Sequence, residues 1–260
     1  MLDWAGTMVD YGSRAPVQAF MAALARHRID VTIDQAREPM GKAKRDHIAS
    51  ILAMPSIAAQ WRDRHGRDYS EGDIDRIYVD FQTLQFDCLA EHSHVIPGAA
   101  EVVARCRQRG LKIGSSTGYT RAMMEVVMAQ AKAQGYVADV MLCADDVAHG
   151  RPAPWLIFEG MRLMNIYPPA AVVTVDDTTV GVEAGRNAGT WSVGIALTGN
   201  EVGLSEKEVA RLSPAELNQR LIRARQRLLE AGAHLVIDSI AELPAVIDEL
   251  ESRLATGVRP

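Results

Sequence analysis

Three short segments, far apart in the sequence, carry residues suited to phosphoryl chemistry. The first, Asp3-Trp4-Ala5-Gly6-Thr7, is a carboxylate followed by a glycine turn. A carboxylate at the end of a strand can attack phosphorus if a cation offsets the charge repulsion. Short D-x-x-G-T matches also arise by chance, so an exposed Asp before an ordinary turn is the alternative.

The second segment, Ile113 to Tyr119, reads as a strand that ends in hydroxyl groups and a glycine. Thr117 and the backbone amides of Gly118 and Tyr119 would face a phosphoryl oxygen, close to the start of the following helix. The alternative is a helix N-cap that binds no ligand.

The third segment places Asp176 and Asp177 at the end of the β-branched strand 171–175. Neighbouring side chains of a strand point to opposite faces, so we expect the two acids to have unequal roles at a cation site. One can hold Mg²⁺, which prefers one or two carboxylates plus water and substrate oxygens; a pair of exposed turn acids is the alternative. Arg151, at an expected loop-to-helix junction, could bind phosphate oxygens through its forked donors.

Two patterns of hydrophobic residues divide the chain. Residues 13–95 read as all-helical, with helices expected at 16–24, 40–52, 56–65 and 71–92. Beyond residue 96, strands are expected at 111–116, 140–143, 171–175, 191–195 and 235–237. They alternate with helices expected at 121–134, 152–164, 182–187, 217–231 and 240–254. Such alternation implies parallel β-α-β units with right-handed crossovers.

The chain is therefore predicted to be an α/β protein, with a doubly wound parallel-sheet core and a helical cap inserted after the first strand. The core would comprise residues 1–12 and 96–260, and the cap residues 13–95. An insert there lies at the C-terminal edge of the sheet, where ligands bind in open α/β folds. Asp3 comes two residues after the start, whereas a strand normally runs about five residues. We therefore expect either a short first strand or a true start further upstream.

Composition limits the kind of protein. The chain has 260 residues, is 48% hydrophobic and carries a net charge of −5, which does not favour nucleic-acid binding. Its three cysteines form no C-x-x-C pair, which fits a reducing compartment. No apolar run approaches the roughly 20 residues that span a bilayer, and no secretion signal is evident. We expect a cytoplasmic protein.

Taken together, the motifs resemble those of the haloacid dehalogenase superfamily in order and spacing, over essentially the whole chain. Within it, Met40 to His47 (MGKAKRDH) resembles the cap signature of the phosphonoacetaldehyde hydrolases, or phosphonatases. The segments 3–7, 116–121 and 150–155 resemble that family's other signatures.

Position 5 bears on the chemistry. Phosphatases and mutases of the superfamily carry a second Asp two residues after the nucleophile, whereas Ala5 cannot transfer a proton. A lysine that forms an imine with an aldehyde is another way to make the leaving group acceptable. On the expected helix, Met40, Lys44 and His47 share one face and Lys42 does not. Lys44 would need a lowered pKa, from burial or nearby cations.

The resemblance implies the remaining roles. Asp3 would be the nucleophile and Lys44 the imine-forming lysine, with His47 moving protons nearby and Met40 shielding the imine. Mg²⁺ would be held by Asp3, Asp177 and the carbonyl of Ala5. The substrate-binding residues would be Thr117, Gly118, Arg151, Gly41, Ser13 and Tyr119. Relatives pair through cap helices, so a homodimer that binds a small phosphonate is expected, with neither nucleic acid nor membrane as a partner.

The chain departs from the family pattern at a few positions. Met8 stands where a small hydroxyl residue is usual, and Ser13 where a cysteine is often found. No downstream acid follows Asp177 closely, and whether Glu183 compensates is open. Two alternatives stay in view: a capped phosphatase or phosphomutase acting on phosphate esters, and a relative that kept the fold and lost catalysis.

Overall fold

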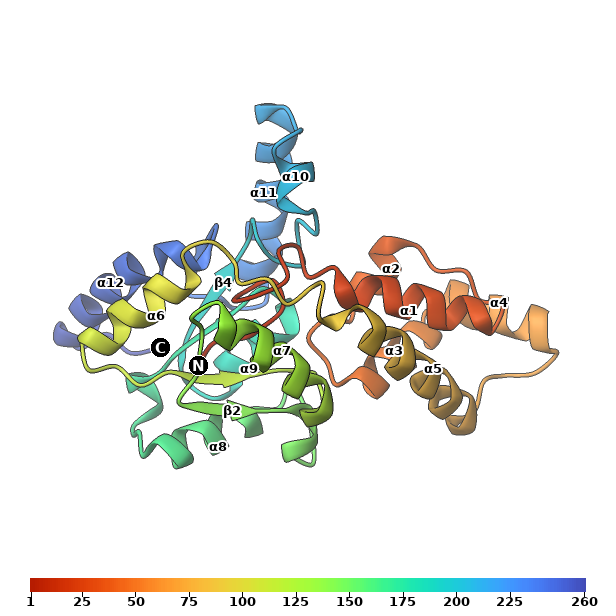
Figure 1. The fold of residues 1–260 in the computed structure, drawn as a ribbon, viewed down its shortest axis with the longest axis horizontal. Coiled ribbons are helices and arrows are strands. Elements are labelled where there is room, and N and C mark those ends of the chain that lie inside the picture. Colours follow the sequence, from red (N-terminus) through yellow and green to blue (C-terminus); the bar gives the residue numbers. More distant parts are fainter.

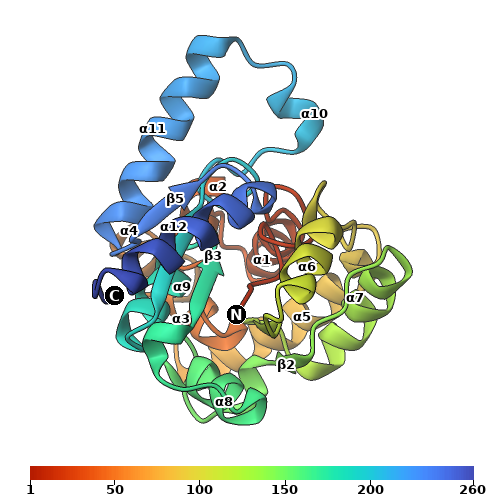
Figure 2. The same ribbon diagram turned by 90° about the vertical axis from the view of Figure 1, so that its left-hand side faces the viewer.

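The computed structural model describes all 260 residues, which form two lobes (Figure 1). Five helices make the first, here called the helical lobe. They are α1 (Ala15–Arg26), α2 (Ile33–Arg37), α3 (Lys44–Leu52), α4 (Pro55–His65) and α5 (Glu71–Leu89). The remainder, here called the α/β lobe, alternates strands and helices, as expected. Figure 2 shows α11 and α10 projecting from that lobe.

The α/β lobe contains five strands. These are β1 (Gly114–Ser116), β2 (Val140–Leu142), β3 (Val173–Asp176), β4 (Trp191–Ile195) and β5 (Leu235–Ile237). Its α-helices are α6 (Ala99–Gln108), α7 (Arg121–Ala133), α8 (Trp155–Met164), α9 (Thr179–Asn187), α10 (Glu206–Val209), α11 (Pro214–Glu230) and α12 (Leu243–Ala255). Short 3₁₀ turns occupy 144–146, 169–171 and 240–242.

The first residues of the chain join two parts of one parallel sheet. β1 pairs with β2, and β3 pairs with β4, which pairs with β5. Leu2 bridges Ser115 on one side and Val175 on the other, both in parallel. The order is therefore β2-β1-(Met1–Asp3)-β3-β4-β5. The Asp3 amide donates to the carbonyl of Val175 at 2.9 Å, which fixes Asp3 at the C-terminal edge of the sheet.

Helices cover both faces of this sheet. Met161 of α8 and Ala184 of α9 belong to the apolar cluster that contains Met1. Val102 of α6 and Ile247 of α12 belong to the main core with Leu2. Because successive side chains of a strand point to opposite faces, Met1 and Leu2 pack against different layers. The arrangement is the expected doubly wound α/β fold.

The helical lobe has its own packed interior. Phe20 of α1 stacks on Phe81 of α5, with ring centroids 4.2 Å apart, and Pro16 occupies the first turn of α1 as predicted. Five expected helix starts were wrong by three or four residues; those expected at 182, 217 and 240 lie at 179, 214 and 243. α3 begins at Lys44 and not at residue 40, because the chain turns at Gly41 with φ +95°. α8 begins at Trp155 and not at Pro152. Helices α2, α6 and α10 were not predicted.

Two neighbouring linkers connect the lobes. Val9 and Val95 form an antiparallel bridge, and the amide of Asp10 donates to the carbonyl of His94 at 3.1 Å. The imidazole of His92 lies 2.9 Å from the carboxylate of Asp10. These contacts tie the outgoing chain to the returning chain.

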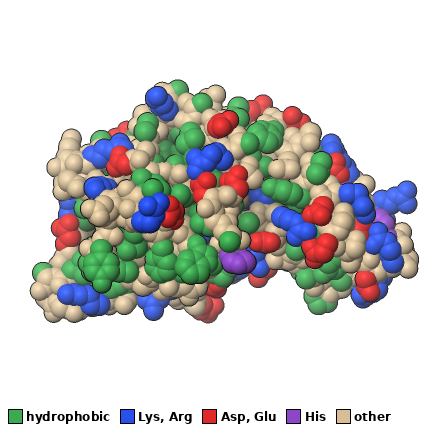
Figure 3. Space-filling model, turned by 90° about the horizontal axis from the view of Figure 1, so that it is seen from below, with side chains coloured by type: hydrophobic (Ala, Val, Ile, Leu, Met, Phe, Trp, Pro, Cys, Tyr) green, Lys and Arg blue, Asp and Glu red, His purple; other side chains and the backbone are tan.

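The surface mixes charges of both signs. Acidic and basic side chains are interspersed on the face shown in Figure 3. Helix α8, at the bottom of Figure 1, faces the viewer there and exposes Trp155, Phe158 and Leu163. None of the helices is both long enough and apolar enough to cross a membrane.

Candidate active site

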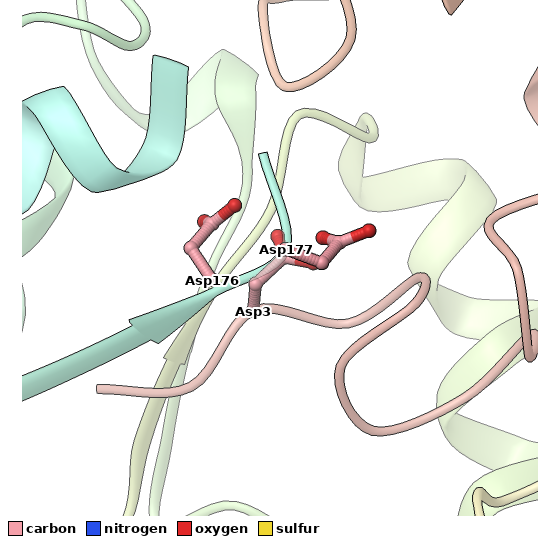
Figure 4. Close-up of side chains that lie close together, drawn as sticks. All are labelled: Asp3, Asp176 and Asp177. Atoms are coloured by element: carbon pink, nitrogen blue, oxygen red, sulfur yellow. The ribbon is translucent and has the colours of Figure 1, made fainter. Parts of the chain in front are cut away.

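Three carboxylates gather where the first segment and β3 end (Figure 4). Asp3, Asp176 and Asp177 each place a carboxylate oxygen within 4.8 Å of the others, and all three are buried. Asp176 ends β3 and Asp177 lies beyond it, so strand alternation no longer separates the two acids. Both belong to the cluster, although their partners differ.

Asp176 and Asp177 are held in unlike ways. Asp176 accepts hydrogen bonds from the amide and the hydroxyl of Thr178, at 3.0 and 2.7 Å. Asp177 accepts one at 2.7 Å on Oδ2 from the amide of Asn200, while its Oδ1 is buried without a partner. A buried carboxylate oxygen with no donor is costly. Asp177 is therefore the better candidate of the two for a cation ligand.

Arg151 links the cluster to the end of β1. Its guanidinium donates to Asp3 at 2.8 Å and lies 2.9 Å from Asp176. It also donates to the carbonyl and the hydroxyl of Ser116, at 2.8 and 2.9 Å. The side chain is buried, so these charge-assisted bonds act with little screening by water.

The cluster carries more negative charge than Arg151 can offset. Burial and the neighbouring Asp176 raise the pKa of Asp3 to about 7, although Arg151 opposes the shift. Burial and Asp3 raise the pKa of Asp177 well above its usual value. A divalent cation with a preference for oxygen ligands would relieve this repulsion and use the unpartnered Oδ1 of Asp177. The residues therefore fit a metal ion.

The turn after Asp3 lies against Asp177. Gly6 has φ +84°, and a side-chain carbon added there would be 2.1 Å from Oδ2 of Asp177. Only glycine allows both this backbone conformation and this approach. The glycine of the D-x-x-G-T motif thus keeps the Ala5–Gly6 backbone beside the carboxylates.

A small cavity of about 20 Å³ lies between the lobes, at the carboxylates. It is little larger than a single water molecule requires. Its lining comprises Asp3, Ala5, Ser13, Pro16, Met40, Gly41, Lys44, Thr117, Gly118, Tyr119, Arg151, Asp177 and Thr178. Every predicted site residue except His47 is among them. The cavity in this conformation is too small for a ligand much larger than water.

Lys44 is a buried amine without an acidic partner. Its side chain forms no hydrogen bond or ion pair, and Nζ lies 4.7 Å from the ring centre of Tyr119 and 5.6 Å from that of Phe20. Burial lowers the pKa of Lys44 to about 8, against an opposing effect of Asp3. At pH 7 about a tenth of this amine is therefore uncharged and nucleophilic, far more than for an exposed lysine.

Met40, Lys42 and His47 occupy different positions relative to Lys44. Met40 lines the cavity from the turn before α3, so the expectation that it shares a helix face with Lys44 was wrong. Lys42 donates to the hydroxyl of Ser50 at 2.9 Å and lies outside the cavity.

His47 lies one turn behind Lys44 on α3. It is fully buried, stacks on Phe20 at 3.8 Å, and has Nε2 2.9 Å from the carbonyl of Ala36. Burial lowers the pKa of His47 well below its usual value, so the ring is neutral. A neutral ring facing a carbonyl carries its proton on Nε2, which leaves Nδ1 as a base without a partner.

Glycines allow the lobes to meet closely at this cavity. A side-chain carbon at Gly118 would lie 2.7 Å from the carbonyl of Lys42, and one at Gly41 would lie 2.4 Å from the hydroxyl of Thr178. Any larger residue at either position would hold the helical lobe away from the sheet.

Of the departures from the family pattern, Ser13 lines the cavity, whereas Met8 and Glu183 lie outside it. Met8 is fully buried in the main core, outside the cavity. Glu183 is exposed on α9, so it does not replace a missing acid at the site. Thr178 and Asn200 were not predicted. Thr178 directly follows the two acids, and Asn200 follows the end of β4, so proximity to a strand end was the available signal.

A larger cavity of about 240 Å³ lies at the opposite ends of β1 and β3. Hydrophobic residues form 19 of its 22 lining residues, and none of the active-site residues lines it.

Comparison with known proteins gives a consistent result. The family model for haloacid dehalogenase-like hydrolases matches residues 1–189. A phosphonoacetaldehyde hydrolase from Nitratidesulfovibrio vulgaris is 45% identical, with all of this chain and 93% of the relative covered. One from Bacillus cytotoxicus is 42% identical, with 97% of this chain and 96% of the relative covered.

Solved structures agree with this assignment. A phosphonoacetaldehyde hydrolase-like protein from Oleispira antarctica superimposes with a TM-score of 0.97 at 42% identity, covering all of this chain and 94% of that one. A β-phosphoglucomutase from Clostridium difficile gives 0.70 at 16% identity, covering 98% and 97%. The latter shows a shared fold alone.

Proposed function

This chain belongs to the haloacid dehalogenase-like hydrolases and, within them, to the phosphonoacetaldehyde hydrolases, and on that basis we propose that it hydrolyses the phosphorus–carbon bond of phosphonoacetaldehyde. The products are acetaldehyde and phosphate. One observation carries the proposal: a buried amine, Lys44, with a pKa near 8, lines the same cavity as the carboxylate of Asp3. Ala5 supplies no acid that could protonate an ester oxygen.

Lys44 prepares the leaving group. Its neutral amine adds to the aldehyde carbon, and loss of water together with uptake of one proton leaves a protonated imine. When the phosphorus–carbon bond breaks, its electron pair moves into this imine and gives an enamine instead of a free carbanion. Protonation at carbon and hydrolysis then release acetaldehyde and restore Lys44. The unpartnered Nδ1 of His47 supports a role in proton movement near the amine, through water, because His47 does not line the cavity.

Asp3 accepts the phosphoryl group. Its carboxylate attacks phosphorus in line with the departing carbon and forms an aspartyl-phosphate, which water hydrolyses to phosphate. Arg151 orients Asp3 through the 2.8 Å bond and, with Thr117 and the amide of Gly118, binds phosphoryl oxygens. Gly41, Ser13 and Tyr119 complete the substrate's surroundings, and Met40 keeps water from the imine.

We propose Mg²⁺ as the cation, held by Asp3, Asp177 and the carbonyl of Ala5. When bound, it offsets the repulsion between the Asp3 carboxylate and the dianionic phosphonate. The buried carboxylate cluster and the unpartnered oxygen of Asp177 support this assignment.

The helical lobe, within residues 13–95, acts as a cap over this site. The small volume of the cavity supports a cycle in which the cap opens to admit substrate and closes for chemistry. Pairing of two copies through this lobe and a cytoplasmic location stay predictions.

Phosphate release from phosphonoacetaldehyde, measured with and without Mg²⁺, tests the proposal. Release that depends on Mg²⁺ is expected, together with a covalent adduct on Lys44 after borohydride treatment in the presence of substrate. Hydrolysis of p-nitrophenyl phosphate without action on phosphonoacetaldehyde would identify a phosphatase instead. Unmodified Lys44 at saturating substrate would exclude the imine route.

A further inference from the structure

Arg37 crosses from the helical lobe to the α/β lobe. It lies at the end of α2, and its guanidinium donates to the carbonyl of Gly12 at 3.0 Å and to that of Gly203 at 2.9 Å. It also donates to the side-chain oxygen of Asn200 at 2.9 Å. Longer bonds reach the carbonyls of Ser13 and Asn200. One side chain thus holds both the linker into the helical lobe and the loop after β4.

That loop, residues 198–203, supports both parts of the cation site. The amide of Asn200 donates to Oδ2 of Asp177 at 2.7 Å. The hydroxyl of Thr198 donates to the carbonyl of Gly6 at 2.9 Å, next to Ala5. A side-chain carbon at Gly199 would lie 2.5 Å from Cβ of Asp177. A shift of loop 198–203 would therefore move Asp177 and the Ala5–Gly6 turn together.

The loop is shaped to receive Arg37. Gly203 has φ +67°, and a side-chain carbon there would lie 2.7 Å from the guanidinium. A second link runs in parallel: Arg227 of α11 pairs with Glu38, next to Arg37, and with the buried Glu201 of the loop. Because α2 belongs to the helical lobe, these contacts exist only while that lobe lies against the α/β lobe.

We propose that Arg37 is a positioning residue that couples closure of the helical lobe to assembly of the cation site. When the lobe closes, Arg37 fixes loop 198–203, and the loop fixes Asp177 and the carbonyl of Ala5. When the lobe opens, loop 198–203 loses its contacts with Arg37, and Asp177 and the carbonyl of Ala5 are held less firmly. The identity of the cation rests on the proposed function, whereas the mechanical coupling rests on the contacts alone.

Arg37→Met tests the coupling, with Arg26→Met as the matched control. Arg26 pairs with Asp80 inside the helical lobe, so its loss removes a charge without touching the loop. In Arg37→Met, Mn²⁺ binding followed by electron paramagnetic resonance without substrate should weaken by about tenfold or more, as for other residues that support metal ligands. Amide hydrogen exchange across 198–203 should accelerate. Arg26→Met should resemble the unaltered protein in both measurements.

Two further variants keep the test decisive if Arg37→Met folds poorly. Arg37→Lys keeps the charge but loses the several donors of the guanidinium. It should weaken Mn²⁺ binding and accelerate exchange across 198–203 to a smaller extent than Arg37→Met. Asn200→Ala removes the side-chain acceptor while keeping the amide that binds Asp177. Adding Arg37→Lys to it should weaken Mn²⁺ binding less than Arg37→Lys does in the unaltered protein. Unchanged Mn²⁺ affinity and loop exchange in the Arg37 variants would overturn the coupling. Neither readout requires phosphonate turnover, so failure of the proposed function would be seen separately.

Discussion

The Nζ atom of Lys44 lies 4.7 Å from the centre of the Tyr119 ring, and no carboxylate pairs with it. Lys44 comes from the helical lobe and Tyr119 from the loop after β1, so the amine is enclosed only when the lobes meet. A carboxylate paired with Lys44 would favour its charged form and raise its pKa. The arrangement therefore lowers the free-energy cost of reaching the neutral, nucleophilic form of Lys44.

Replacing Lys44 by Arg should abolish phosphonate hydrolysis. Arginine keeps the charge but cannot form an imine, and we expect phosphate release to fall by about 10³-fold or more, equivalent to about 4 kcal/mol of barrier. Lys42→Arg is the matched control, because Lys42 binds Ser50 outside the cavity. Near-normal phosphate release by Lys44→Arg would refute the imine mechanism.

The rate should depend on pH through Lys44. Its pKa is lowered to about 8 by burial, so imine formation in the free enzyme should rise about tenfold per pH unit below that value and level off above it. The rate of borohydride trapping at subsaturating substrate measures this step. A flat profile between pH 6 and about 9 would show that Lys44 does not limit the step.

The carboxylate cluster should make the metal-free protein less stable as pH rises. The pKa of Asp3 is near 7 in the folded chain and about 4 when unfolded, so between these values the folded state binds more protons. The contribution of Asp3 to the free energy of unfolding then decreases with rising pH. Each loss of about 1 kcal/mol should lower Tm by about 2–4 °C at this chain length.

Mg²⁺ should reverse this loss at high pH and have little effect at low pH, where the carboxylates are protonated. Thermal unfolding with and without Mg²⁺ at both pH values provides the comparison. Asp177→Asn should raise the metal-free Tm above pH 7 and remove the response to Mg²⁺. The buried N-terminal amine and His47 have lowered pKa values and act in the opposite sense, so Asp3→Asn isolates the contribution of Asp3. A pH dependence of the metal-free Tm that is the same with and without Asp3→Asn would contradict the raised pKa of Asp3.

Arg151→Lys should impair catalysis more than folding. A lysine cannot bind Asp3, Asp176 and Ser116 together, and we expect kcat/KM for phosphonoacetaldehyde to fall by about 10²-fold, typical of a lost charge-stabilising donor. Arg121→Lys, whose exposed partner is Asp146, serves as control. Arg151→Met should also destabilise the protein, by about 3–5 kcal/mol, because it leaves buried acids unpaired. Equal kcat/KM for Arg151→Lys and the unaltered enzyme would remove Arg151 from the site.

Local patterns were sufficient for the fold class and for most of the cavity. Strand-end motifs pointed to Asp3, Thr117 and the pair Asp176–Asp177, because the C-terminal ends of parallel strands meet at one edge of the sheet. The choice of Asp177 within that pair came from the family resemblance. Helical spacing gave a wrong prediction for Met40, because Gly41 turns the chain before α3 starts. A helix start depends on where the backbone can turn, and the apolar spacing of 40–52 did not reveal it.

The sequence by itself determined the chemical groups: a carboxylate, an amine, an arginine and paired acids, each in a recognisable local motif. The tertiary structure alone decided how these groups affect one another. Burial brings the pKa values of Asp3 and Lys44 to within about one unit, near 7 and 8. Arg37 and Asn200, 163 residues apart, meet only through folding. Desolvation and long-range hydrogen bonds depend on which surfaces come together, and no local pattern encodes that.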